Sequence, residues 1–330
     1  MKDIVVLDGV RTAIGTFGGS LSGTSPIELG SIVAKEALAR SGVEGKQVGN
    51  VVFGHVINTE PRDMYLSRAA SIAAGVPEKA PAMNVNRLCG SGLQAIVSAA
   101  QSLMLGDATM ALAGGSESMS RSPYIVPAIR WGQKMGDTGA TDMMLGALNC
   151  PFGTGHMGVT AENVAAEYDI TREAQDAFAL QSQERALNAL KEGYFKSQIV
   201  PVEVKVKRNT ASFDTDEHPR PGTDAAKLSK LSGVNGPDLT VTAGNASGVN
   251  DGAAAVLIAS EASAKSHGLT PMARVIGMSS AGVAPRIMGI GPAPASQKVL
   301  DRAGLTIDQM DVIELNEAFA SQGLATLRQL

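Results

Sequence analysis

A cysteine at a strand-to-helix junction is the residue best suited to chemistry in this sequence. The segment Asn-Arg-Leu-Cys-Gly-Ser-Gly at 86–92 follows a strand-like run at 82–85, and apolar residues then recur at helical spacing. Cys89 is therefore expected at a helix N-terminus, where unpaired N–H groups and the helix dipole favour a thiolate. Such sites can lower a cysteine pKa from about 8.5 to roughly 3.5–7.5. The alternative is that Cys89 is a small buried hydrophobic residue.

Two further residues sit where ligands gather. Asn316 opens the segment Asn-Glu-Ala-Phe after an expected strand at 312–315, and the carboxyl ends of strands collect ligands in open α/β sheets. Its amide could orient a water or donate to an oxyanion, or it could simply cap a helix. His156 lies between glycines at 153–158, which suits either a ligand site or a plain surface loop.

A small, polar stretch at 242–248 could lie against an extended ligand or form an ordinary strand-to-loop turn. Scattered cations, Arg220 and Lys227 among them, could meet phosphates or form a solvated face. No metal motif, P-loop or dinucleotide fingerprint occurs in the sequence. We therefore expect neither a metal nor a cofactor.

Composition restricts the class of protein. The net charge of −4, without long charged runs, argues against nucleic acid or a membrane surface as the main partner. Two cysteines make no disulfide framework, which fits a reducing, cytoplasmic setting. The N-terminus lacks a signal-peptide pattern, and no continuous apolar run approaches the roughly 18 residues of a membrane helix.

The elements that would position these residues follow an α/β pattern. Short apolar runs at 4–7, 51–53 and 110–115 predict buried strands, and a capping box at Ser25 starts a helix that Gly42 ends. From 119 to 248 the alternation of strands and helices is lost, although a long helix is expected at 171–192 and a half-exposed strand at 202–206. The α/β sequence pattern returns at 253–259.

A faint internal repeat connects the two ends of the chain. Residues 38–43 match 300–305 at an offset of 262, and the register continues to 51 and 313. The first copy ends near 118, so its counterpart should end near 380. This predicts a second half shortened by about fifty residues, with an unpaired sheet edge.

Seven ordered segments together resemble the thiolases, in particular biosynthetic acetoacetyl-CoA thiolases and bacterial β-ketothiolases. These segments are 9–15, 86–92, 114–119, 156–162, 243–248, 288–292 and 316–319. The resemblance implies a layered α/β/α/β/α fold of two duplicated βαβαβ-type halves, the second incomplete, with an inserted loop domain. The implied divisions are 1–118 completed by about 249–270, the loop domain at 119–248, and 271–330.

The resemblance also implies roles for single residues. Cys89 matches the nucleophile that takes the acyl group as a thioester, and Asn316 matches the residue that holds a water in an oxyanion hole. The remaining matched positions surround CoA, its pantetheine arm or the acyl pocket: Leu148, His156, Met157, Arg220, Ala243, Ser247, Met288 and Phe319. The implied enzyme condenses two acetyl-CoA to acetoacetyl-CoA and CoA, acts on 3-ketoacyl-CoA in reverse, and is a dimer or tetramer.

The sequence departs from the family in two places. The Gly-His-Pro segment and the Cys-x-Gly segment, which supply an activating histidine and a second cysteine, do not occur in it. The match is also weak around Lys227 and Asn235, where CoA contacts are expected. These departures predict an impaired thiolase, and leave two alternatives: a silent relative that binds CoA or a protein, and a longer-chain 3-ketoacyl-CoA thiolase of β-oxidation.

Overall fold

The computed structural model describes residues 3–330, which form two compact units. The first unit comprises the chain up to Gly146 together with Phe195–His218 and Val249–Val275. The second comprises Ala147–Tyr194, Pro219–Gly248 and Ile276–Leu330. Residues 119–248 contribute to both units, and their role as a loop domain over CoA stays a prediction.

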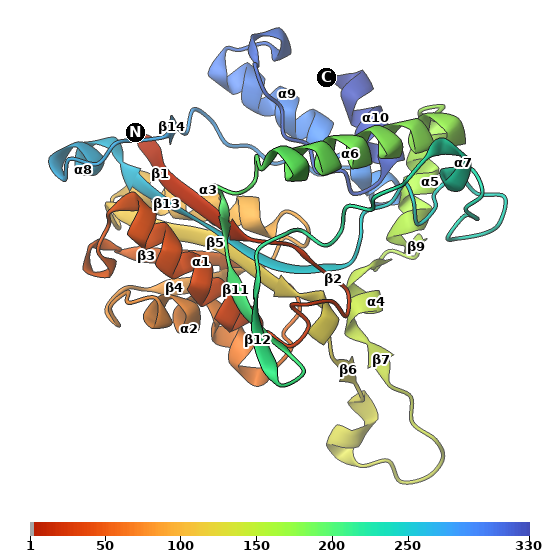
Figure 1. The fold of residues 1–330 in the computed structure, drawn as a ribbon, viewed down its shortest axis with the longest axis horizontal. Helices are drawn as coiled ribbons and strands as arrows, with labels where there is room; N and C mark the ends of the chain where they lie inside the picture. The colour runs from red at the N-terminus through yellow and green to blue at the C-terminus, as the bar shows by residue number, and fades with distance from the viewer. Residues whose placement is uncertain (1–2) are drawn as a thin grey trace. The chain divides into compact units, whose positions relative to one another are not determined.

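The first unit is built on a mixed eight-stranded sheet (Figure 1). The main path runs β10 (Ile199–Val200), β1 (Ile4–Thr12), β13 (Asn250–Ser260), β5 (Met110–Ser118), β3 (Asn50–Gly54) and β4 (Ala82–Val85). Two short strands join it, β14 (Ala273–Arg274) on β1 and β2 (Gly15–Thr16) on β13. Strands β3, β4 and β5 are parallel, whereas β13 is antiparallel to both of its neighbours. The predicted α/β class and its buried strands are confirmed.

Helices cover both faces of this sheet. Phe53 faces α1 (Pro26–Ser41), since a Cβ on Gly30 would lie 3.7 Å from its ring, while Gly54 faces α3 (Ser91–Leu105). Successive strand residues point to opposite faces, so α1 and α3 lie on opposite sides. Helix α2 (Leu66–Ala73) packs beside α1, and α8 (Glu261–Ser266) follows β13.

The ends of α1 follow from local sequence as predicted. The Ser25 hydroxyl accepts the Glu28 N–H at 3.2 Å, and Gly42 closes the helix with φ +69°. A side-chain oxygen at the N-cap and a left-handed glycine after the last turn satisfy backbone groups that the helix leaves unpaired.

Helix α3 overlaps a stretch, Leu88–Leu105, that is long and apolar enough on average to cross a membrane. This differs from the expectation that no stretch would qualify. Polar residues such as Gln94 and Ser98 interrupt it, and the helix packs on β3, β5 and β13. A helix with one face on a sheet is typical of a protein core, so we treat it as a core helix.

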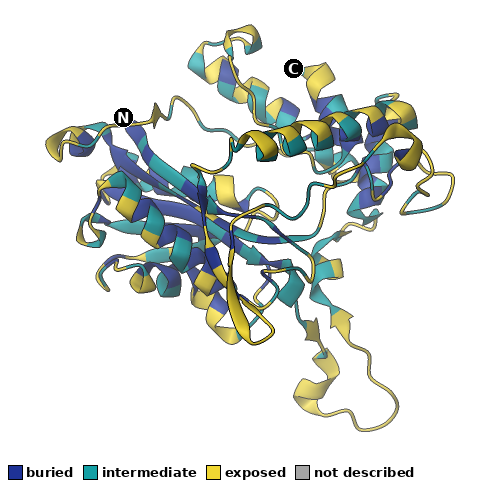
Figure 2. Ribbon diagram, in the orientation of Figure 1, coloured by how far each residue is buried: buried dark blue, intermediate teal, exposed yellow. Residues whose placement is uncertain are grey.

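Two hairpins complete the first unit. In the pair β11 (Val202–Val206) and β12 (Asn209–Phe213), Val202 and Val204 are buried and Glu203 and Lys205 are exposed, as the alternation predicted. Val206, at the hairpin end, departs from it and is 50% exposed. The pair β6 (Tyr124–Ile125) and β7 (Thr141–Asp142) carries an arm that is almost wholly exposed (Figure 2). Short helix α4 (Met143–Ala147) follows the arm.

The second unit is mainly helical. Its helices are α5 (Met157–Glu167), α6 (Arg172–Glu192), α7 (Ala225–Leu228), α9 (Pro292–Ala303) and α10 (Ala320–Gln329), with a small hairpin of β8 (Asn149–Cys150) and β9 (Gly155–His156). Helix α6 confirms the predicted 171–192 helix. The strand predicted at 312–315 is wrong: these residues pair with no strand among those described, and Val312 is 77% exposed. A strand needs a hydrogen-bonded neighbour, and none is present for this segment.

Candidate functional site

The Cys89 turn, residues 86–91, joins β4 to α3. Cys89 is exposed and lies two residues before Ser91, the first residue of α3, whose N-cap is Gly90. The predicted position at a helix N-terminus is confirmed, and the alternative of a buried hydrophobic cysteine is wrong. The first-turn N–H groups and the positive end of the helix dipole therefore lie beside a solvent-accessible thiol.

Glycine at the end of β3 allows this turn to approach the sheet. A Cβ on Gly54 would lie 2.6 Å from the carbonyl carbon of Ser91, closer than side-chain contacts allow. Since β3, β4 and β5 are parallel, their carboxyl ends meet at this edge, where ligands bind in α/β sheets. The Cys89 turn thus occupies the edge of the sheet where a reacting group is expected.

A polar pair lies at the same edge: His55, which is buried and follows β3, and Glu117, which is partly exposed near the end of β5. The Nδ1 atom of His55 lies 2.9 Å from the carbonyl oxygen of Ser116 and 3.3 Å from Oε1 of Glu117. Glu117 also accepts the N–H groups of Val56 and Ile57, at 2.9 and 3.2 Å. Burial raises the pKa of the Glu117 carboxyl, against the opposing effects of His55 and these N–H groups. The pair braces the loop after β3.

Sequence reasoning did not single out His55 or Glu117. The available signal was their position: His55 directly follows β3, and Glu117 lies near the carboxyl end of β5. Polar residues at strand ends are candidates for function, but only the parallel pairing of β3 with β5 brings these two together.

In the second unit, the loop at 243–247 meets the start of α10. The Ser247 N–H donates to the carbonyl of Ala318 at 3.0 Å, and Ala246 forms a backbone bridge with Phe319. Three predicted CoA-binding residues, Ala243, Ser247 and Phe319, therefore lie on two adjoining segments.

Asn316 lies just before these segments and is exposed. It stands four residues ahead of α10, whose N-cap is Phe319, so the alternative reading of Asn316 as a helix cap is wrong. An exposed amide on an irregular segment remains able to hold a water or to donate to an oxyanion.

A hydrogen-bond network shapes the 243–247 loop. The Asn245 amide oxygen accepts the Thr242 N–H at 2.8 Å, and its amide nitrogen donates to Asp176 and to the carbonyl of Thr240, both at 3.0 Å. On the preceding residues, Glu162 accepts from the backbone of Thr240. Side chains from α5 and α6 therefore hold this loop, which is more than the plain turn considered from sequence.

Helix α5 connects most of the remaining candidates. The Met157 N–H donates to the carbonyl of Leu148 at 2.8 Å, and His156 caps the helix because its Nδ1 accepts the Gly158 N–H at 3.1 Å. With Nδ1 occupied as an acceptor, a neutral His156 ring presents Nε2–H to a ligand. His156 is thus a helix cap with a fixed ring orientation, and not the plain surface-loop residue considered from sequence.

Met288 and Arg220 lie on other segments of the second unit. Met288, 39% exposed, belongs to a 3-10 segment that packs on α5 and is tied to it by Asn163, whose amide donates to the carbonyl of Arg286 at 2.9 Å. The Arg220 N–H donates to Gln183 on α6. Arg220 is therefore held through α6, whereas the other CoA candidates are organised around α5 and its neighbours.

Cys150 has the second thiol. Hydrogen bonds from the Thr154 hydroxyl and the Phe152 N–H lower the pKa of the Cys150 thiol. It lies in the β8–β9 hairpin of the second unit, within two residues of the predicted Leu148. Cys150 is thus the natural internal control for experiments on Cys89.

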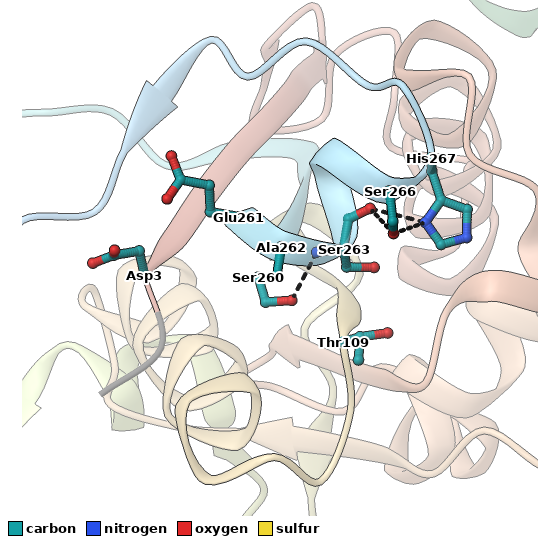
Figure 3. Close-up of a pocket in the computed structure, with 8 residues that line it drawn as sticks. All are labelled: Asp3, Thr109, Ser260, Glu261, Ala262, Ser263, Ser266 and His267. Atoms are coloured by element: carbon teal, nitrogen blue, oxygen red, sulfur yellow. Dashed lines mark hydrogen bonds between the residues drawn. The ribbon is translucent and has the colours of Figure 1, made fainter.

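A separate pocket of about 610 Å³ lies where β13 ends and α8 begins (Figure 3). Asp3, Thr109 and Glu261 are among its lining residues. Thr109 directly precedes β5, so this pocket sits at the amino end of the parallel strands, opposite the Cys89 turn. No cluster that could hold a metal ion occurs among residues 3–330.

Two family models together match nearly all of the chain. The model for "Thiolase, N-terminal domain" matches residues 4–262, and the model for "Thiolase, C-terminal domain" matches residues 269–330. The expectation that the chain lacks its C-terminal part is therefore not supported. The impaired activity inferred from that absence is not supported either.

Similar proteins agree with this assignment. Beta-ketothiolase BktB of Cupriavidus necator is 58% identical over 333 residues, which cover 100% of this chain and 84% of that protein. An acetyl-CoA acetyltransferase of Syntrophomonas wolfei is 46% identical, with 100% and 83% covered.

Solved structures share the fold. The acetyl-CoA acetyltransferase of Bacillus anthracis superimposes with a TM-score of 0.97 at 45% identity, covering 100% of this chain and 83% of that one. Human mitochondrial 3-ketoacyl-CoA thiolase in complex with CoA gives 0.96 at 42% identity, with 100% and 82% covered. The fold is the thiolase fold, and the chain belongs to the thiolase family of enzymes.

Proposed function

We propose that this protein condenses two acetyl-CoA molecules to acetoacetyl-CoA and free CoA, and catalyses the reverse thiolytic cleavage. The exposed Cys89 thiol at the start of α3 is the observation that carries the proposal. Its thiolate attacks the thioester carbonyl of the first acetyl-CoA, CoA thiolate leaves, and an acetyl-enzyme thioester remains. The second acetyl-CoA then loses an α-proton, which ends on the released CoA thiolate to give free CoA. The resulting carbanion attacks the acetyl group, and the Cys89 thiolate is released.

Asn316 is proposed to hold a water that donates to a thioester oxygen as negative charge develops. Stabilisation of this kind acts only where charge appears in the transition state, which is why it accelerates the reaction. The exposed position of Asn316, on the segment directly before Phe319, supports this role.

CoA is proposed to bind the second unit. Support comes from the arrangement of the candidates. His156 and Met157 lie at the start of α5, where the Leu148 carbonyl accepts the Met157 N–H. Ala243 and Ser247 adjoin Phe319, and Met288 packs on α5 through its segment. Arg220 is proposed to meet a CoA phosphate, for which a guanidinium is well suited. No cofactor beyond the CoA esters is expected.

A preference for short acyl chains is part of the proposal. Relatives carry names of both kinds, since the acetyl-CoA acetyltransferase of Syntrophomonas wolfei is 46% identical and a Beta-ketoadipyl-CoA thiolase of Pseudomonas aeruginosa is 48% identical. The alternative is therefore a thiolase of longer 3-ketoacyl-CoA. The ratio of kcat/KM for acetoacetyl-CoA to that for a 3-keto-C8-CoA separates the two, and a ratio at or below one would favour the alternative.

The apolar arm between β6 and β7 is proposed to mediate assembly into a dimer or tetramer. Ile129, Trp131 and Met135 on the arm are 62%, 88% and 91% exposed, which is unusual for such side chains in an isolated protein. Light scattering that gave only the 33.9 kDa mass of one chain would contradict this. A cytoplasmic location is proposed from the two free cysteines.

The decisive experiment replaces the nucleophile. Cys89→Ala should reduce thiolysis of acetoacetyl-CoA by at least about 10³-fold, because the covalent route is lost. Cys150→Ala is the matched control and should retain activity within about threefold. Intact-protein mass after exposure to acetyl-CoA should show one acetyl group, mapped to the Cys89 peptide. Wild-type activity in Cys89→Ala, or an inactive wild type that still binds CoA, would overturn the proposal.

A further inference from the structure

Leu88, the residue before the candidate nucleophile, has a strained backbone. Its φ is +46°, in the left-handed region that bulky L-residues rarely adopt. Within residues 3–330, two other non-glycine residues share a positive φ, and both lie at turns: Asp169 follows the end of α5, and Lys207 lies in the tight turn between β11 and β12. Leu88 also lies in a tight turn, closed by the Gly90 N–H on the Arg87 carbonyl at 3.0 Å. A leucine adopts this conformation at a cost, so neighbouring groups must hold it in place.

The Ser91 hydroxyl binds two backbone groups of this turn, the N–H of Arg87 and the carbonyl of the strained Leu88. It accepts the Arg87 N–H at 2.9 Å and donates to the Leu88 carbonyl at 2.6 Å. Ser91 is only 5% exposed, so water competes little for these hydrogen bonds. One side chain therefore spans the segment that contains Leu88 and leads directly into Cys89.

Ser91 itself is fixed against the sheet. Its backbone packs on Gly54 at the end of β3, where even one added carbon would lie 2.6 Å from the Ser91 carbonyl carbon. The hydroxyl thus connects the sheet edge to the Arg87–Leu88 segment of the turn. Rigid support of this kind is what keeps a reacting atom in position.

We propose that Ser91 is a positioning residue, which sets the orientation of the Cys89 thiol by holding Leu88 in its left-handed conformation. Ser91 takes no part in bond making, since its hydroxyl is committed to two backbone groups. This inference rests on the proposed function of Cys89 as the acyl-accepting nucleophile. It adds a residue that acts on the reaction only through the shape of the turn.

The first test removes the hydroxyl. Ser91→Ala should lower kcat for thiolysis of acetoacetyl-CoA by about 30- to 100-fold, since small misplacement of a reacting group costs rates of this order. KM should stay within about twofold, because substrate binding is not altered. Ser98→Ala is the matched control: this serine lies on the same helix, accepts from Gln94 at 2.9 Å, and should leave kcat unchanged.

The second test favours the left-handed conformation at position 88 by substitution of Leu88 itself. Asparagine adopts positive φ far more readily than leucine, and the Leu88 side chain is half exposed. Adding Leu88→Asn to Ser91→Ala should therefore recover at least tenfold of the lost kcat. A role for Ser91 in general core stability would not be repaired by a change at the exposed Leu88 side chain.

Iodoacetamide labelling of Cys89, followed by peptide mass spectrometry, measures the turn independently of turnover. Ser91→Ala should slow labelling at least threefold, and the double variant should recover the wild-type rate. Ser98→Ala should label at the wild-type rate. If wild type shows no thiolase activity, the proposed function fails while this comparison still tests Ser91. Unchanged kcat and labelling in Ser91→Ala, a loss that Leu88→Asn does not restore, or failure of both variants to fold would overturn the inference.

Discussion

Two regions of this protein begin alike and end differently. Helix α1 closes at Gly42 with φ +69°, and α9 closes at Gly304, 262 residues later, with φ +68°. A short 3-10 turn follows each helix, Gly45–Gln47 and Ile307–Gln309. In each, a glutamine side chain accepts the N–H of the residue before the turn, at 2.7 and 2.8 Å. The internal repeat is therefore also a repeat of local structure.

The two copies part at the next element. In the first copy, Val51 lies in β3 between β4 and β5 and is fully buried. In the second copy, its counterpart Ile313 is 49% exposed in a segment without regular structure. Helix ends and tight turns depend on residues within one or two turns of each other, whereas a strand depends on partners from elsewhere in the chain. Similar sequences thus gave the same helix ends and turns in both copies, but a strand only in the first.

The largest difference between the copies should appear when a charge replaces the matched apolar residue. Val51→Asp should lower the free energy of unfolding by about 4 kcal/mol or more, because it buries an unpaired carboxylate between two strands. Ile313→Asp should cost about 0.5 kcal/mol or less, because that side chain is already half in water. Urea unfolding followed by circular dichroism measures both, and equal losses would show that the two segments are not packed differently.

The matched glycines should instead behave alike. Gly42→Ala and Gly304→Ala each place a Cβ in the left-handed region and should each cost about 1 kcal/mol. Neither position is crowded, since the nearest atom to an added Cβ is 3.9 Å away at Gly42 and none lies within 4 Å at Gly304. The same unfolding measurement applies. A loss at one site only would mean that the caps are not equivalent.

The smallest effect concerns the loop that follows β3, which Glu117 braces. Burial raises the pKa of Glu117 in the folded protein, so the unfolded chain loses this proton first as the pH rises. The contribution of Glu117 to the free energy of unfolding is therefore most favourable below the ordinary carboxyl pKa near 4.5. It declines as the pH rises through the raised pKa of Glu117. Because Glu117→Gln has no proton to lose, its free energy of unfolding should fall by about 0.5 kcal/mol less than that of wild type as the pH rises. The difference is modest because the carboxylate is partly exposed.

Stability measured from pH 4 to pH 7 tests this effect. Glu314→Gln, at an exposed position in the second copy, is the control and should leave the pH profile parallel to that of wild type. A Glu117→Gln profile that is also parallel to wild type would show that burial of Glu117 does not penalise its charge.

In the candidate site, too, local features were predictable from sequence and contacts between distant residues were not. The helix periodicity after 91 placed Cys89 at a helix N-terminus, and α3 confirms it. The strained Leu88, by contrast, has no sequence signal, because leucine does not predict a positive φ. The His55–Glu117 pair was also missed, because the two residues are 62 positions apart and meet only through the pairing of β3 with β5.

By itself the amino-acid sequence determined the helix between Ser25 and Gly42 with its caps, the helix at 171–192 and the position of Cys89, because each depends on neighbours along the chain. Tertiary structure decided which apolar segments became strands, which polar residues met at the sheet edge, and how firmly the Cys89 turn is held. These outcomes depend on contacts between distant segments, and such contacts form only when the whole sheet is assembled.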